Sequence, residues 1–236
     1  MSSDERDGRR VTRDFVRIRK SALAANDRVA GELRDRFRDA GTLVLNLVSA
    51  PGSGKTTLLE QTVRRLRDEL SLGVLEGDVA TELDAERIRA LGVPARQIVT
   101  GGACHLESRI VRRALEEAEF PPLDILFIEN VGNLVCPTSY DLGEDFKVAL
   151  VSVPEGDDKP FKYPGIFRRA LIAVVTKVDL LPHFSFDLDR VRERVATLNP
   201  AARFVAVSST TGEGVDAWCD LLREALAAKR EGRPWP

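Results

Sequence analysis

Short apolar runs alternate with stretches of helical periodicity over most of this chain of 236 residues. Between most of the runs, apolar side chains recur three or four positions apart, which is typical of amphipathic helices. Strands that alternate with helices predict an α/β fold with a parallel sheet and helices on both of its faces. The expected strands are at residues 43–48, 73–75, 123–128, 148–153, 171–175 and 204–207.

The first forty residues have a different pattern, with many charges and few apolar positions. Val29, Leu33 and Phe37 lie four positions apart and predict an amphipathic helix over residues 26–40, which precedes the sheet and ends near Gly41. We expect residues 1–25 to be a flexible tail and residues 231–236 to be a C-terminal tail. No repeat or linker divides residues 26–230, so they are predicted to form a single domain.

Composition narrows the class of protein. A net charge of −2, with 43% apolar and 31% charged residues, is typical of a globular chain and excludes a disordered or collagen-like one. No apolar run approaches the length of a bilayer span, and the polar N-terminus is no secretory signal. Three cysteines are too few for a disulfide framework, which favours the cytoplasm. The balanced charge indicates neither a nucleic acid nor a membrane as partner.

Residues 49–57 (SAPGSGKTT) follow the first predicted strand and open a helix, as a phosphate-binding P-loop does. Ser49 stands where the first glycine is usual. Gly52 and Gly54 can adopt positive φ and let the backbone approach a phosphate closely. Successive N–H groups, including that of Ser53, would then face the anion at the helix N-terminus. The motif predicts a P-loop NTPase.

Side chains of the predicted P-loop helix and of two later strand ends are candidates for the chemistry of hydrolysis. Lys55 can reach the β- and γ-phosphate oxygens, the Thr56 hydroxyl can ligate Mg²⁺, and Thr57 would approach the α-phosphate. Asp78 and Glu129 close two strands where a Mg²⁺ ion or the attacking water would need a carboxylate. Lys55, Thr56, Asp78 and Glu129 are therefore the predicted catalytic residues, with Thr56 and Asp78 as magnesium ligands. The alternative for either acid is that it only solvates a strand end.

Residues 129–132 (ENVG) are similar to the phosphate-sensing Asp-x-x-Gly of GTPases, with Glu in place of Asp. The N–H group of Gly132 would sense the γ-phosphate. Asn133 follows where a water-orienting glutamine is usual in that motif. We therefore expect slow intrinsic turnover.

A guanine site is predicted after the strand at residues 171–175. Thr176, Lys177 and Asp179 resemble the Asn-Lys-x-Asp motif, with Thr for Asn. The Asp179 carboxylate would accept from N1–H and the 2-amino group of guanine, whereas adenine would leave it unpaired. The Lys177 stem would cover the base. The loop expected at guanine O6 consists of Ser208, Ser209 and Thr210.

Two thiols and an imidazole form a candidate metal site. Cys104 and His105 lie just before a helical stripe, and Cys136 lies shortly after Gly132. Such donors suit Zn²⁺, Ni²⁺ or Cu, although a lone cysteine is more often a small buried hydrophobe, as expected for Cys219. The following helix is expected to lower the pKa of the first thiol. Three donors are one short of a tetrahedral shell, so water or a second copy of the chain, at a dimer interface, would complete it.

The position of Cys136 gives a hypothesis of regulation. It shares a short loop with Gly132, so a shift of that loop on hydrolysis would change the metal shell. Nucleotide state would then control metal transfer.

The motifs together resemble the hydrogenase nickel-incorporation GTPases, the HypB family of SIMIBI-type P-loop GTPases, over residues 26–230. The resemblance implies GTP or GDP with Mg²⁺, and Ni²⁺ or Zn²⁺ at Cys104, His105 and Cys136. It further implies a homodimer promoted by nucleotide or metal, and delivery of nickel to the [NiFe]-hydrogenase large subunit with a partner metallochaperone. The resemblance rests on residues 46–60 (NLVSAPGSGKTTLLE), 76–88 (EGDVATELDAERI), 100–107 (TGGACHLE), 129–137 (ENVGNLVCP), 152–163 (SVPEGDDKPFKY), 176–182 (TKVDLLP) and 208–214 (SSTTGEG).

One departure and three alternatives accompany the resemblance. Residues 1–40 contain neither Cys nor His, so an N-terminal nickel motif or storage tract is not expected. A related urease-type nickel-insertion GTPase would have a sequence similar to Cys-Pro-His in its metal loop. Here Thr138 follows Cys136 and Pro137. A P-loop kinase would need an acceptor pocket and no guanine motif. A metal-binding scaffold would use nucleotide only to set its dimer state.

Overall fold

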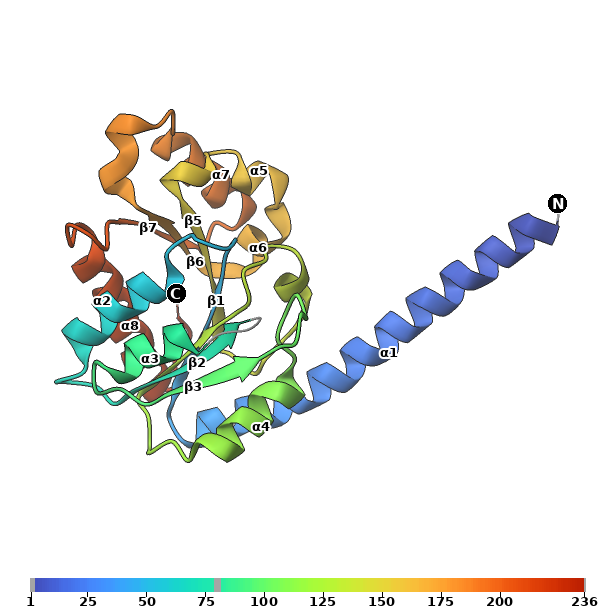
Figure 1. Cartoon of the computed structure of the whole chain (residues 1–236), viewed down its shortest axis with the longest axis horizontal. Helices are drawn as coiled ribbons and strands as arrows, with labels where there is room; N and C mark the ends of the chain where they lie inside the picture. The colour runs from blue at the N-terminus through green and yellow to red at the C-terminus, as the bar shows by residue number, and fades with distance from the viewer. Residues whose placement is uncertain (1–2, 79–81, 236) are drawn as a thin grey trace.

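A seven-stranded parallel sheet forms the centre of the molecule (Figure 1). The computed structural model describes residues 3–78 and 82–235, with side chains from residue 21 onward. The strand order is β3-β2-β4-β1-β5-β6-β7, and every neighbouring pair is parallel, which confirms the predicted fold class. The strands are β1 (Leu43–Val48), β2 (Leu72–Asp78), β3 (Ala95–Val99), β4 (Ile125–Glu129), β5 (Phe146–Ser152), β6 (Ala170–Thr176) and β7 (Arg203–Val207).

Helices cover both faces of the sheet. Leu45 of β1 points into one apolar cluster with α2, α3 and α8, while its neighbour Val44 points into another with α1 and α4. Helices α6 and α7 pack in a third cluster, on the Val44 side, around Val48. The helices are α1 (Ser3–Asp39), α2 (Lys55–Leu66), α3 (Leu83–Arg89), α4 (Ser108–Ala118), α5 (Lys159–Lys162), α6 (Pro164–Arg169), α7 (Leu188–Leu198) and α8 (Val215–Arg230). The 3₁₀ turns within the described residues are η1 (Cys136–Ser139), η2 (Val153–Glu155) and η3 (Val178–His183).

Helix α1 is longer than the apolar spacing predicts. It ends at Asp39, and Gly41 follows with a φ of +68°, which fits the predicted stop. Its buried stripe of Val29, Leu33 and Phe37 packs beside α4. The backbone of residues 3–25 continues this helix instead of forming an irregular tail, because a helix satisfies its own hydrogen bonds and needs no apolar stripe to do so. The flexibility of that segment stays a prediction, and the side chains of residues 1–20 lie outside the described part.

Strand β3 carries no apolar run and is absent from the strands that the pattern predicts. Ala95, Gln97 and Ile98 are buried in this strand, whereas Arg96 and Val99 are exposed. It is an edge strand that pairs only with β2. Edge strands need fewer apolar residues than central ones, which explains the missing signal.

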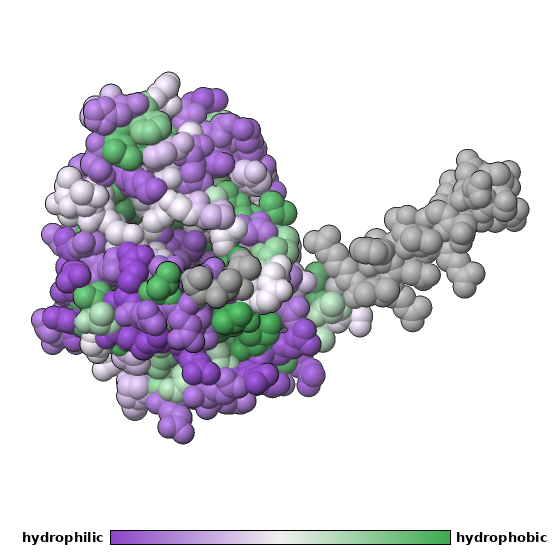
Figure 2. All heavy atoms as spheres, viewed as in Figure 1, coloured by the Kyte–Doolittle hydropathy of each residue, from purple (hydrophilic) through white to green (hydrophobic). Residues whose placement is uncertain are grey.

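The surface is mainly hydrophilic on the face shown in Figure 2, with small separate apolar patches. Within the described residues, no helix combines the length and apolar character needed to cross a bilayer. After α8 the chain turns back, and the ring of Trp235 lies 5.0 Å from that of Phe146. Large apolar side chains exposed to solvent are Leu83, Val99, Val135, Phe161 and Phe184.

Candidate functional site

The P-loop joins β1 to α2 at the carboxyl edge of the sheet, where ligands of parallel α/β folds bind. Gly52 and Gly54 have φ angles of +74° and +88°, the conformations that the glycines of the motif allow. Lys55 is buried, and its Nζ donates to Ser49 Oγ at 3.1 Å. A cavity of about 480 Å³ opens beside this loop and is lined by Thr56 and Thr57 among others. Its size and backbone suit the phosphates of a nucleotide.

Two buried carboxylates lie on the floor of this cavity. Glu129 Oε1 accepts from Thr56 Oγ1 at 3.1 Å and lies 3.6 Å from Lys55 Nζ. Glu76 stands opposite Glu129 in the β2–β4 register. Burial raises the pKa of Glu76 well above its usual range, and the neighbouring Glu129 raises it further. Burial also raises the pKa of Glu129, which the Lys55 ammonium partly opposes.

Each of these carboxylates keeps one oxygen with no hydrogen-bond partner among the described residues: Oε1 of Glu76 and Oε2 of Glu129. The two side chains are only 2% and 6% exposed. Unpaired buried oxygens are costly, and hard divalent cations such as Mg²⁺ prefer oxygen ligands. The floor therefore fits Mg²⁺, which would be held by Thr56 and a carboxylate and would neutralise phosphate charge.

Further acidic and basic side chains complete the lining. Asp78, at the end of β2, lines the cavity as predicted from its place in the sequence. Three other charged lining residues have no predicted role: Glu76, Asp84 and Arg87. Alternation along β2 could have identified Glu76, since residues two apart share a face. Arg87 pairs with Glu60 at 2.7 Å and with Asp84 at 2.9 Å.

Gly132 packs directly on the P-loop. A Cβ atom at this position would lie 2.7 Å from Pro51 Cγ and 2.8 Å from Pro51 N. Only glycine fits without displacing the loop. The segment after β4 therefore touches the phosphate pocket, where the motif predicts a γ-phosphate sensor.

The loop after β6 also folds onto the P-loop. Lys177, a non-glycine residue with a φ of +60°, donates from Nζ to Gly52 O at 2.7 Å. Thr176 Oγ1 donates to Ser53 O at 2.6 Å, so the residue that replaces the usual asparagine holds the P-loop. Asp179 Oδ1 is buried with no partner among the described residues. An orphaned carboxylate oxygen fits the donors of guanine.

The third loop of the predicted base site follows β7. Ser208 is fully buried, and its carbonyl accepts from Gly212 N at 2.9 Å. Ser209 is half-buried and Thr210 exposed. The cavity lining extends to Lys177 but does not include Asp179 or residues 208–210.

The two thiols and the imidazole predicted as metal donors lie together. The donor atoms of Cys104, His105 and Cys136 are all within 4.8 Å of one another. Cys104 Sγ lies 3.4 Å from His105 Nδ1. His105 Nε2 is buried without a hydrogen-bond partner among the described residues and lies 3.9 Å from Glu107 Oε1. The donor set fits Zn²⁺ or Ni²⁺, and the exposure of Cys104 leaves room for a fourth ligand.

The predicted lowering of the Cys104 pKa is wrong. The neighbouring Cys136 thiol raises the pKa of Cys104. Helix α4 begins only at Ser108, and the effect of a helix end falls off within its first turn. Burial lowers the pKa of His105, which favours the neutral imidazole that binds metals. Cys219 is buried in the core as predicted, and burial raises its pKa to about 11.

Comparisons with known proteins agree on one family. A family model described as "CobW/HypB/UreG, nucleotide-binding domain" matches residues 43–206. The hydrogenase maturation factor HypB of Azotobacter chroococcum is 48% identical over 219 residues, which cover 93% of this chain and 72% of that protein. The hydrogenase/urease maturation factor HypB of Helicobacter pylori is 42% identical over 94% of this chain and 91% of its own length.

Two solved structures have the same fold at similar identity. The crystal structure of HypB from Archaeoglobus fulgidus superposes with a TM-score of 0.81 and is 41% identical, covering 86% of this chain and 100% of that one. HypB from Helicobacter pylori in complex with nickel also gives 0.81, at 42% identity, over 88% of this chain and 96% of that one.

Proposed function

This chain belongs to the CobW/HypB/UreG family of nucleotide-binding proteins, and we propose that it is a GTP-hydrolysing nickel metallochaperone for [NiFe]-hydrogenase. The observation that carries the proposal is a single loop, residues 129–136, that connects the two candidate pockets. Glu129 and Gly132 line the phosphate cavity, and Cys136 belongs to the Cys/His cluster. The names of the similar proteins, hydrogenase maturation factors, support the cellular role.

The base preference is for guanine. The orphaned Oδ1 of Asp179 is suited to the N1–H and 2-amino donors of guanine. Lys177 is held across the P-loop, where its stem can cover the base. Residues 208–210 would supply backbone groups to the O6 side.

Hydrolysis needs positioning and charge stabilisation. The Lys55 ammonium and the backbone of Gly52, Ser53 and Gly54 would bind the phosphates, while Thr56 with Asp78 or Glu129 would hold Mg²⁺. The Asn133 amide is engaged with Cys104 O and, through its oxygen, with Val135 N. This engagement supports slow turnover, because the side chain after Gly132 is not directed at an attacking water.

The cargo is Ni²⁺, with Zn²⁺ as the competing ion. Cys104, His105 and Cys136 would bind it, and a water molecule or a second copy of the chain would supply the fourth ligand. If a second copy supplies the ligand, the protein would be a homodimer. Val135, which is apolar, exposed and next to Cys136, suits such an interface. A partner metallochaperone would load the site, and the hydrogenase large subunit would receive the metal.

A urease-type role is the second candidate. The Helicobacter pylori relative is named a hydrogenase/urease maturation factor. The chain here has Thr138 after Cys136 and Pro137, and its imidazole is at position 105. The donor set is therefore closer to that expected for the hydrogenase type.

The test is the Ni²⁺ affinity of the chain with GDP and with a non-hydrolysable GTP analogue, together with its mass in each state. Coupling predicts different affinities, because the loop at residues 129–136 serves both pockets. Equal affinities would remove the gating hypothesis. Release of inorganic phosphate from GTP without an acceptor would separate this function from that of a kinase, and hydrolysis too slow to matter for maturation would favour a scaffold.

A further inference from the structure

Asn26 is a buried amide on the side of the apolar stripe of a highly charged helix, α1. It is only 7% exposed, and uses its side chain and its carbonyl for contacts outside the helix. A buried amide needs such partners, since an unmade hydrogen bond is costly. The partners lie on two separate segments of the domain, and each segment carries donors of the Cys/His cluster.

The first partner is Ser108, the first residue of α4. Ser108 N donates to Asn26 Oδ1 at 2.9 Å, and Ser108 Oγ donates to the Asn26 carbonyl at 2.8 Å. The first N–H groups of a helix lack intrahelical acceptors, and Glu107, the residue before α4, gives no side-chain cap. Asn26 therefore caps α4 from another helix. Ser108 is fully buried and follows Cys104 and His105 in the sequence, so this contact fixes where their segment ends.

The second partner is the segment that follows Cys136. Asn26 Nδ2 donates to the Asp141 carbonyl at 2.7 Å. Arg34, two turns further along α1, binds both carboxylate oxygens of Asp141 at 2.6 and 2.7 Å. Burial would raise the pKa of Asp141, but the Arg34 guanidinium holds it below its usual range. This loop is thus anchored on α1 by both an amide and an ion pair.

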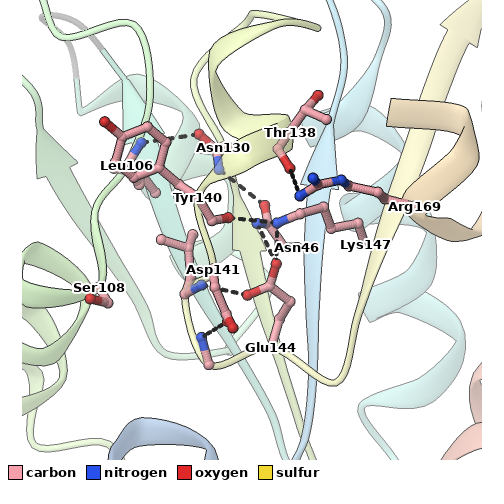
Figure 3. Close-up of polar contacts among 12 residues, drawn as sticks. Asn46, Leu106, Ser108, Asn130, Thr138, Tyr140, Asp141, Glu144, Lys147 and Arg169 are labelled. Atoms are coloured by element: carbon pink, nitrogen blue, oxygen red, sulfur yellow. Dashed lines mark hydrogen bonds and ion pairs between the residues drawn. The ribbon is translucent and has the colours of Figure 1, made fainter. Parts of the chain in front are cut away.

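The same loop carries an aromatic ring that contacts the Cys/His cluster. The ring of Tyr140 lies 3.8 Å from that of His105. Figure 3 shows Tyr140 joined through its carbonyl to a polar network, in which Lys147 Nζ donates to Tyr140 O at 2.7 Å and pairs with Glu144. Glu144 in turn accepts from Asn46 of β1. The segment with Tyr140 and Asp141 is therefore held to the sheet by the Lys147–Glu144 network and to α1 by Asn26 and Arg34.

We propose that Asn26 is a positioning residue for the Cys/His site, and that docking of α1 and metal affinity are linked through it. One amide fixes the segment that leads from Cys104 and His105 and the segment that follows Cys136. Loss of this contact would let the two segments separate and spread the donor atoms. By linkage, metal binding stabilises the docked α1 to the same extent that docking strengthens metal binding. The inference rests on the proposed metal function of the three donors.

The principal variant is Asn26→Ala in the full chain, with Zn²⁺ as titrant and Co²⁺ as a spectroscopic probe. We expect metal affinity to fall by about tenfold, the lower end of the range for residues that orient metal ligands, because Asn26 acts on the donors only through Ser108 and Asp141. The Co²⁺ absorption bands would shift because the donor geometry changes. Metal-free GTP affinity would stay unchanged, which also shows that the chain is folded. Wild-type affinity with wild-type Co²⁺ bands would overturn the proposal.

Two controls separate positioning from general loss of stability. Glu32→Gln breaks the exposed Glu32–Arg112 pair, which joins the same two helices at 3.0 Å without touching either donor segment. Ala225→Gly lowers helix stability by about 1 kcal/mol in α8, which covers the face of the sheet opposite to α1 and α4. Both should bind Zn²⁺ as the wild type does. Equal losses in Asn26→Ala and in these controls would mean that Asn26 has only a structural role.

Asn26→Asp and hydrogen exchange test the two-sided link. The aspartate can still accept from Ser108 N but cannot donate to the Asp141 carbonyl, so affinity should fall in this variant also; wild-type affinity would overturn the joint role. Zn²⁺ should slow amide exchange in residues 21–39 of the wild type, and unchanged exchange would count against the linkage. If the wild type binds no metal, or if Cys136→Ala binds metal as tightly as the wild type does, the proposed function itself fails.

Discussion

The side-chain amide of Asn133 donates a hydrogen bond to the carbonyl oxygen of Cys104, with 3.2 Å between the two atoms. Asn133 follows Gly132, which packs on Pro51 of the P-loop, and it precedes Cys136 by three residues. The segment of Cys104 is therefore hydrogen-bonded to the same loop that carries Cys136. A displacement at the phosphate end of this loop would therefore be transmitted to both sulfurs. It would reach Cys136 through the backbone and Cys104 through the Asn133 hydrogen bond.

Removal of one thiol should weaken metal binding without affecting nucleotide binding. In Cys136→Ala, two of three donors remain, and we expect Zn²⁺ and Ni²⁺ affinity to fall by about 10²-fold, equivalent to about 3 kcal/mol. Isothermal titration with each metal, and with GTP, measures both properties. Cys219→Ala is the matched control, because Cys219 is buried in the core away from the cluster. Retained metal stoichiometry and affinity in Cys136→Ala would reject that ligand.

Exchange of the base-site carboxylate for an amide should change base preference. In Asp179→Asn the side chain can donate as well as accept, which matches xanthine at the position where guanine carries its amino group. We expect GTP affinity to fall by about 10²-fold or more and XTP affinity to rise. Competition binding with both nucleotides measures the shift, with the exposed Asp187→Asn as control. An unchanged preference for GTP would exclude Asp179 from the base site.

A methyl group at Gly132 should uncouple the two pockets. In Gly132→Ala the new Cβ would clash with Pro51, and relief of such a clash costs about 1–3 kcal/mol. We expect roughly tenfold weaker binding of a GTP analogue and a smaller difference in Ni²⁺ affinity between the GTP and GDP states. Gly31→Ala is the control, because a Cβ there meets nothing within 4 Å. Wild-type GTP affinity with an intact nickel response would contradict the prediction.

The buried carboxylate of Glu76 should make the nucleotide-free protein less stable as pH rises. Burial and the adjacent Glu129 raise the pKa of Glu76 in the folded chain, so folding disfavours its charged form. The contribution of Glu76 to stability is therefore full below the ordinary carboxyl range and is lost as pH rises toward neutrality. Glu76→Gln removes this loss, and we expect it to raise the free energy of unfolding at neutral pH by about 1–3 kcal/mol.

Denaturant unfolding of Glu76→Gln and wild type across the acidic to neutral range measures this effect. The gain should shrink as the pH falls, since both side chains are then uncharged. Glu86→Gln, an exposed position on α3, is the control and should show no such dependence. A variant that is less stable than the wild type at neutral pH would contradict the argument.

Much of the fold could be predicted because central strands of a parallel sheet are buried on both faces and must be apolar at nearly every position. Strand β3 was not predicted because two of its five side chains, Arg96 and Val99, face solvent at the edge of the sheet. The P-loop could be predicted for a related reason, since phosphate binding demands a fixed order of glycine, lysine and threonine. The residue types of the Cys/His cluster were likewise visible in the sequence, but their proximity depends on the tertiary fold.

Other parts of the sites carry no local pattern. Asn26 is a single polar residue whose partners lie far along the chain, so no periodicity identifies it. The direction of the Cys104 pKa shift was mispredicted because it depends on a second thiol that only folding brings near. Glu76 shares a strand face with Asp78 and could have been found by alternation alone.

Lys177 links the loop after β6 to the P-loop. Its left-handed backbone is unfavourable for a residue with a side chain, yet it directs the ammonium group onto the Gly52 carbonyl. The predicted base loop and the P-loop are thus joined within the folded chain, and the conformational entropy of this contact is lost on folding. Nucleotide binding should consequently lose little entropy in ordering these two loops against each other.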